Sequence, residues 1–194
     1  MSFGYTNADG VSGATIVAQD GNAYNRIDPT NSFSWGLNFG FNVNHTTEIG
    51  FMFGQQLSKM NVSGPTASKD VGDLTISSYH PYLGFNFGEE DAKVRPYILI
   101  GFGATSYGQV NYTRFDGTSG NTQSQTRYST TVGAGIKAYP NPKFGIRVGI
   151  QWTPTYIKTD ATGMWCDPYW GCYTTGNAQY SNQFQFLGGL LFRF

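Results

Sequence analysis

Charged residues are scarce in this chain. Asp, Glu, Lys and Arg make up 12% of its 194 residues, about half of the usual quarter, and the formal net charge is zero. A chain without net basic charge gives no electrostatic reason to expect nucleic acid as a partner. Histidine and cysteine occur only twice each. No spacing typical of a phosphate-binding loop, an EF-hand or a zinc site is present, so the sequence implies no cofactor.

Long apolar runs are missing as well. No stretch approaches the ~18 apolar residues of a membrane-spanning helix. A transmembrane β-barrel needs no such run, because only alternate residues of its strands face lipid. Met1–Tyr5 has neither the basic start nor the apolar core of a signal peptide. An exported protein with this start is expected to be a mature or recombinant form, in which Met1 could come from cloning.

Alternating apolar and small residues are abundant instead. Phe33–Asn44 alternates without a fault, with one face of Phe, Trp, Leu and Val and the other of Ser, Gly and Asn. This stripe covers about 11 residues, the length that a tilted strand needs to cross a bilayer. Similar patterns predict strands at Ile49–Leu57, Tyr79–Phe87, Pro96–Ala104, Thr126–Ala138 and Phe144–Tyr156.

The last strand carries the most informative pattern. Its apolar positions are Phe184, Phe186, Leu190, Phe192 and Phe194. A glycine at 189 followed by spaced hydrophobic residues and a terminal Phe resembles the C-terminal signal of bacterial outer-membrane β-barrels, carried here by Gly189, Phe192 and Phe194. Leu187 departs from that signal, which usually has a polar residue there. The resemblance implies that the barrel-assembly machinery is a partner.

Connection lengths predict the topology. Short turns at Val43–Thr47, Gly88–Val94 and Tyr139–Lys143 alternate strictly with long polar segments. With Ser2–Asn7 as a short eighth strand, whose periplasmic half is expected upstream of the given sequence, the barrel closes with an even number of strands. The long segments, expected to be extracellular loops of one domain spanning 1–194, are 8–31, 58–72, 113–124 and 159–181.

The whole pattern resembles the small eight-stranded barrels of the OmpA/OmpX/OmpW type. The resemblance implies an all-β, antiparallel, up-and-down transmembrane barrel, with lipid and lipopolysaccharide around it and a periplasmic C-terminus. A soluble β-sandwich or lipocalin-like barrel also alternates. In that fold the Gly-, Ser- and Asn-rich face would have to serve as the solvent surface, for which it carries too few charges.

Five charged residues are predicted to point into the lumen near the periplasmic end: Glu48, Arg95, Lys137, Arg147 and Arg193. Because an isolated buried charge is costly, we expect them to form a network. Such a network fits a structural plug of ion pairs, and an ion path is the alternative. His80 also faces the lumen in mid-strand, where we expect a hydrogen-bonded core histidine and not a catalytic one.

Two cysteines, Cys166 and Cys172, lie close together in the fourth long loop. In an exported chain this spacing predicts a disulfide. Four aromatic residues surround it and form a candidate interaction surface: Trp165, Tyr169, Trp170 and Tyr173. Their alternative role is to pack on neighbouring loops or to sit in the lipopolysaccharide layer.

We therefore expect an outer-membrane barrel with a structural or interaction role, as a surface-recognition protein or a subunit of an envelope complex with a protein partner. A narrow channel and a lipid-modifying outer-membrane enzyme are the two alternatives.

Overall fold

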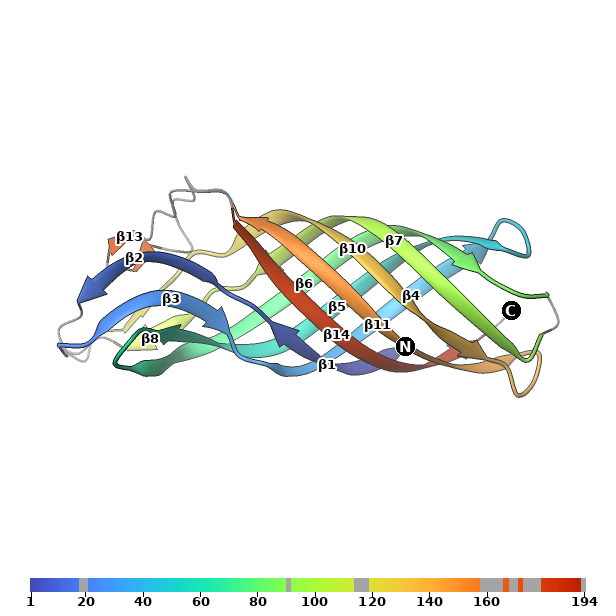
Figure 1. Ribbon diagram of the computed structural model, residues 1–194, viewed down its shortest axis with the longest axis horizontal. Coiled ribbons are helices and arrows are strands. Elements are labelled where there is room, and N and C mark those ends of the chain that lie inside the picture. Colours follow the sequence, from blue (N-terminus) through green and yellow to red (C-terminus); the bar gives the residue numbers. More distant parts are fainter. Residues whose placement is uncertain are drawn as a thin grey trace.

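The structure is a computed structural model that describes residues 1–17, 21–89, 92–113, 119–157, 166–167, 171–172 and 179–192. Eight antiparallel strands close into a ring (Figure 1). In ring order they are β1 (Ser2–Ala8), β4 (Ser32–Asn42), β5 (Thr47–Ser63), β6 (Ser68–Asn86), β7 (Val94–Tyr107), β10 (Gln125–Ala138), β11 (Phe144–Ile157) and β14 (Gln179–Phe192). The described residues contain no helix long and apolar enough to cross a membrane.

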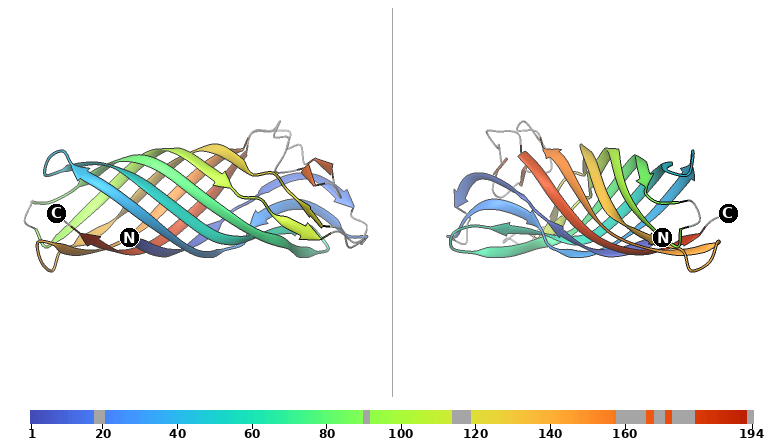
Figure 2. Two further views of the ribbon diagram at one scale, coloured as in Figure 1. Left: turned by 180° about the vertical axis from the view of Figure 1, so that it is seen from behind. Right: turned by 45° about the vertical axis from the view of Figure 1, so that its right-hand side comes forward.

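The two ends of the barrel differ. At one end lie three small hairpins, made by β2 (Val11–Val17) with β3 (Ala23–Pro29), β8 (Asn111–Thr113) with β9 (Ser119–Asn121), and β12 (Cys166–Asp167) with β13 (Gly171–Cys172). At the other end the ring strands are joined by short turns (Figures 1 and 2). We call these the hairpin end and the turn end. The predicted short turns lie at the turn end, and three of the four predicted long connections contain these hairpins.

The polarity of the barrel wall inverts along the longest strands. In the half of β5 next to the turn end, Ile49 and Phe51 point outward, whereas the inward positions are small or polar apart from the buried Met52. Beyond Leu57, toward the hairpin end, the outer face becomes polar and the inner face apolar, so that Lys59 is exposed while Met60 is 5% exposed. β6 changes in the same way, from an apolar to a polar outer face. The half of the barrel next to the turn end, called the lower barrel below, is thus apolar outside. The hairpin end is built like a water-soluble β-structure, with its apolar residues inside.

This inversion corrects the predicted loop at 58–72. β5 and β6 continue as paired strands up to Ser63 and Ser68, so the connection consists of residues 64–67. The predicted loop 8–31 likewise contains the β2–β3 hairpin, and β3 pairs with β5 from Arg26–Ser63 to Pro29–Met60. The segments are hydrogen-bonded sheet because period-2 alternation continues through them with the two faces exchanged.

The first strand closes the ring, as predicted. β1 pairs with β14 on one side and with β4 on the other. Its pairing with β4 ends at Ser2–Gly36, whereas β4 continues to Asn42. The N-terminus therefore lies short of the turn end (Figure 1).

Glycines leave space for Tyr82 and Tyr97, which fill the lumen near the turn end. A Cβ on Gly50 would lie 2.6 Å from the ring of Tyr82, and one on Gly149 would lie 2.5 Å from the hydroxyl of Tyr97. Both distances are shorter than any normal carbon contact. Tyrosine rings beside glycines therefore fill this part of the lumen.

Candidate functional site

The turn end of the lumen holds a charged network centred on Glu48. Its carboxylate accepts hydrogen bonds from Lys137 Nζ at 2.5 Å and from the Tyr82 hydroxyl at 2.6 Å. The side-chain amide of Asn86 lies 3.4 Å from the same carboxylate. The side chains of Lys137 and Glu48 are 8% and 14% exposed. A buried pair with this many donors compensates much of the cost of removing both charges from water.

Two buried arginines accompany this pair. Arg147 Nε donates to the Tyr97 hydroxyl at 2.7 Å, and its guanidinium lies 4.8 Å from the centre of the Tyr97 ring. With the Asn38 amide turned so that its oxygen faces the guanidinium, Arg147 Nη1 also donates to that oxygen at 3.0 Å. Arg95 Nη2 donates to the backbone carbonyl of His45. Neither arginine forms an ion pair with a carboxylate among the described residues.

The middle of the lumen is packed with small polar side chains. His80 Nε2 and Ser129 Oγ lie 2.9 Å apart, and Thr105 Oγ1 donates to the same Ser129 oxygen at 2.9 Å. Nearby, Thr153 Oγ1 donates to Thr131 Oγ1 at 3.1 Å. His80 is 1% exposed, and its hydroxyl partner lies two strands away on β10. The prediction of a hydrogen-bonded, lumen-facing core histidine is confirmed, and its partner is Ser129.

Above this layer, the hairpin end contains a hydrophobic core. It gathers buried residues from β2, β3, β5, β6, β7 and β11, namely Val11, Tyr24, Ile27, Met60, Val62, Leu74, Ile76, Tyr107, Val110 and Ile157. The β2–β3 hairpin contributes three of them and pairs with β5 at the edge of this core. Burial of this kind stabilises each large side chain by about 1.5–3 kcal/mol. The hairpin end is therefore a packed part of the fold.

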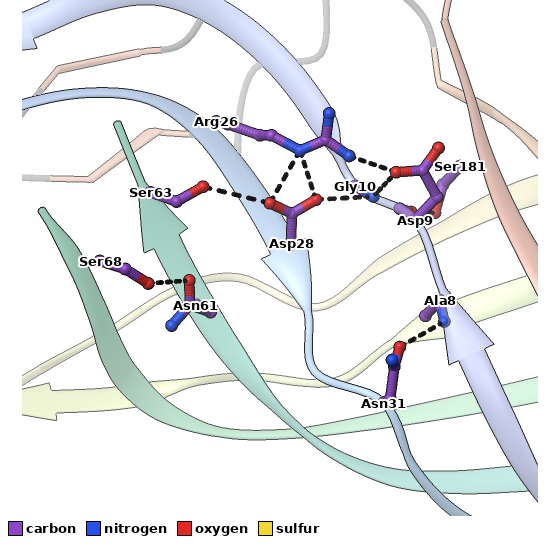
Figure 3. Close-up of polar contacts among 10 residues, drawn as sticks. All are labelled: Ala8, Asp9, Gly10, Arg26, Asp28, Asn31, Asn61, Ser63, Ser68 and Ser181. Carbon is purple, nitrogen blue, oxygen red and sulfur yellow. Dashed lines mark hydrogen bonds and ion pairs between the residues drawn. The ribbon is translucent and has the colours of Figure 1, made fainter. Parts of the chain in front are cut away.

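An ion cluster fastens the β2–β3 hairpin to the barrel wall (Figure 3). The Asp28 carboxylate accepts from Arg26 Nε at 2.7 Å, from the Gly10 amide at 3.0 Å and from the Ser63 hydroxyl at 3.3 Å. Asp9 forms a second ion pair with Arg26. The hydrogen bond to Asp28 raises the pKa of the Arg26 guanidinium, which keeps it charged. The cluster ties β1, β2, β3 and β5 together at the rim.

The sequence matches the family described as outer membrane protein beta-barrel domain over residues 1–194. The chain belongs to this family. The apolar outer band of the lower barrel is accordingly its lipid-facing surface, and the protein resides in the bacterial outer membrane.

Solved outer-membrane proteins share the fold at low sequence identity. The structure of OprG from Pseudomonas aeruginosa is similar with a TM-score of 0.61 and 13% identity, over 99% of this chain and 94% of that one. Neisserial surface protein A is similar with a TM-score of 0.55 and 12% identity, over 100% and 97% of the two chains. No curated protein sequence matches the chain. These similarities show the fold of an outer-membrane β-barrel. The role of the protein is argued from its own residues.

The predicted site residues divide into three groups. Glu48, Arg95, Lys137 and Arg147 lie in the lumen, and Gly189 and Phe192 lie in β14. The backbone register places Cys166 opposite Cys172. Six predicted residues lie outside the described part of the chain: Trp165, Tyr169, Trp170, Tyr173, Arg193 and Phe194.

Sequence reasoning missed two sets of polar residues. Asn38 and Asn86 join the turn-end network, and their only signal was an inward position beside predicted charges. Asp9, Arg26 and Asp28 form the rim cluster, which lies in the segment 8–31 that was predicted to be a loop. Among the described residues, no group of three or more His, Cys, Asp or Glu could hold a metal ion.

Proposed function

We propose that this outer-membrane barrel is a surface-recognition protein or a subunit of an envelope complex, acting through its hairpin end. The observation that carries the proposal is the polarity inversion of β5 and β6. A membrane anchor alone needs only strands that match the lipid band. This chain extends those strands beyond the band and packs an apolar core of its own inside the extension.

We assign the hairpin end to the outside of the cell. Outer-membrane barrels have short periplasmic turns and longer extracellular connections. The same assignment places the turn end and the C-terminus in the periplasm. Preorganised extracellular structure favours binding, since less conformational freedom is lost when a partner docks. The ion cluster of Asp9, Arg26 and Asp28 supplies such order to the first hairpin.

The fourth of the long segments, 159–181, is the contact surface that we favour. Opposed residues of an antiparallel pair have Cα atoms about 4.5–5.5 Å apart, within the range that a disulfide spans. The register of Cys166 and Cys172 therefore supports the proposed disulfide. The aromatic side chains at 165, 169, 170 and 173 surround these cysteines in the sequence and suit a binding surface.

A catalytic role is not part of this proposal. His80 is enclosed by Ser129 and Thr105 in the middle of the lumen, where a lipid or peptide substrate has no access.

Replacing both cysteines tests the proposal. In the double variant Cys166→Ser/Cys172→Ser, the segment 159–181 loses the proposed disulfide. We therefore expect the fraction of the protein found in higher-mass complexes, on native gels of outer membranes, to fall by at least half. Barrel migration on unheated gels should be unchanged, since the disulfide lies outside the ring. The matched control is Ser77→Ala, on the outer wall. Equal fractions of the cysteine variant and the wild type in higher-mass complexes would contradict the proposal.

A further inference from the structure

The hairpin of β8 and β9 is rooted in the hydrophobic core of the hairpin end (Figure 1). Val110, directly before β8, is fully buried in that core. Its amide donates to Thr122 Oγ1, and the Thr122 amide donates to the Val110 carbonyl, both at 3.0 Å. A Cβ on Gly72 would lie 2.4 Å from the Asn111 carbonyl oxygen, so the hairpin also lies directly against β6. The hairpin is therefore held in place before any ligand binds.

One face of this hairpin presents uncharged polar side chains. Asn111 lies opposite Asn121 in the register, and Ser119 shares their face because it lies two residues from Asn121 on the same strand. All three are exposed, whereas Tyr112 on the other face is 6% exposed. Directly opposed residues have Cβ atoms about 4.5–5.5 Å apart, so the two amides can contact one ligand together.

A cavity of 470 Å³ opens at this hairpin. Five described residues of β8 and β9 line it: Asn111, Tyr112, Ser119, Gly120 and Asn121. Its volume lies within the roughly 300–1,000 Å³ of small-molecule sites. A Cβ on Gly120 would lie 2.6 Å from the Tyr112 ring, so this position leaves the backbone bare. The lining thus combines two carboxamides, one hydroxyl, one open stretch of backbone and one aromatic ring.

The polar groups of this lining are available to a ligand. In the described part of the chain, the side chains of Asn111, Ser119 and Asn121 form no hydrogen bond or ion pair. Each carboxamide offers an acceptor oxygen and two N–H donors, and the serine hydroxyl both donates and accepts.

This chemistry selects an uncharged, hydroxyl-rich ligand. A sugar hydroxyl donates and accepts, so it matches a carboxamide in both roles. A charged ligand would find no counter-charge among the described lining residues. An apolar ligand would remove water from the amides without replacing their hydrogen bonds. The ring of Tyr112 supplies an apolar surface for the C–H groups of a sugar.

We propose that the β8–β9 hairpin binds an uncharged saccharide, with Asn111 and Asn121 as its main hydrogen-bonding ligands. This inference rests on the proposed function only in placing the site outside the cell. Binding by the purified protein depends neither on that placement nor on residues 166 and 172, so the two proposals can fail separately.

Binding is measured with the full chain in tetraethylene glycol monooctyl ether, because a maltoside detergent would itself present a sugar. The probe is a printed array of neutral oligosaccharides of glucose, galactose, mannose and N-acetylglucosamine, with acidic oligosaccharides beside them. We expect neutral spots to retain the labelled protein. Titration calorimetry with the strongest of them then gives the affinity. In the double variant Asn111→Ala/Asn121→Ala the affinity should fall at least about tenfold, since two hydrogen-bonding groups are lost.

Asn61→Ala is the matched control. It removes an amide from the outer wall of β5 that does not line the cavity, so the affinity should stay within about threefold of the wild type. Asn121→Asp keeps the shape of the side chain but loses its N–H donors, and it should also weaken binding. This second variant replaces the double variant if unheated gels show that the latter does not fold.

The outcomes decide the proposal. Weaker binding in the cavity variants with an unchanged Asn61→Ala control would support it. Absence of binding to every neutral oligosaccharide, retention by acidic spots alone, or equal losses in the cavity variants and the control would overturn it.

Discussion

At the scale of single residues, the turn-end network depends on Glu48. Its carboxylate is the shared acceptor of Lys137, Tyr82 and Asn86. The space for the Tyr82 ring exists because position 50 is glycine. A change at this one carboxylate therefore disturbs a buried charge and two further side chains at once.

We expect Glu48→Gln to lower the free energy of unfolding by about 3–5 kcal/mol, because Lys137 is left as a buried charge without a counter-ion. The measurement is urea unfolding of the protein in lipid vesicles. The double variant Glu48→Gln/Lys137→Met should recover a large part of the loss, since it removes the orphaned charge. A single-variant change below about 0.5 kcal/mol would show that the pair does not stabilise the barrel.

Inward charges at 48, 95, 137 and 147 were predictable because the strand register assigns every second residue to the lumen. Their partners were not. The contacts of Glu48 with Lys137 and of Arg147 with Tyr97 join residues 89 and 50 positions apart in the chain. Only closure of the ring brings them together.

At the scale of elements, β5 and β6 show how one alternation can serve two environments. Both strands keep period 2 across the change of environment, up to the register shift at Met60–Asn61, and the apolar face moves from outside to inside near Leu57 and Ile76. The expected strand ended at Leu57 because the apolar stripe on its outer face ends there. The strand itself continues, since its backbone hydrogen bonds do not depend on which face is apolar.

The inversion predicts opposite responses to the same substitution on the outer face of β5. Phe51→Arg should cost about 2–4 kcal/mol, as for arginine on the lipid face of a barrel. Asn61→Arg lies above the lipid band beside Asp70 and should change stability by less than about 0.5 kcal/mol. Folding yield and urea unfolding in vesicles measure both. Similar costs at the two positions would contradict the assigned edge of the lipid band.

At the scale of the whole molecule, the lumen is filled in layers. A charged network lies at the turn end, a polar layer around His80 and Ser129 lies in the middle, and the hydrophobic core lies at the hairpin end. A small cavity of 20 Å³ lies in the middle, beside Met52 and Gln151. An eight-stranded barrel has an interior just wide enough for its own side chains.

This filling predicts that the purified protein does not conduct ions. In planar bilayers the current should equal that of the bare lipid, because an ion would have to displace the polar middle layer and cross the apolar core. Steady conductance steps that change selectivity in Lys137→Gln protein would establish a channel instead. A porin of known conductance, inserted in the same bilayers, is the positive control.

The sequence by itself determined the eight strands of the ring, the face that each presents to lipid, and the short turns at one end of the barrel. These features follow from local period-2 patterning, which any segment displays without its partners. The tertiary structure decided which charges pair in the lumen, how the β2–β3 hairpin packs on β5, and where a cavity remains. Those features depend on contacts between residues far apart in the chain, which form only when β1 meets β14 and closes the ring.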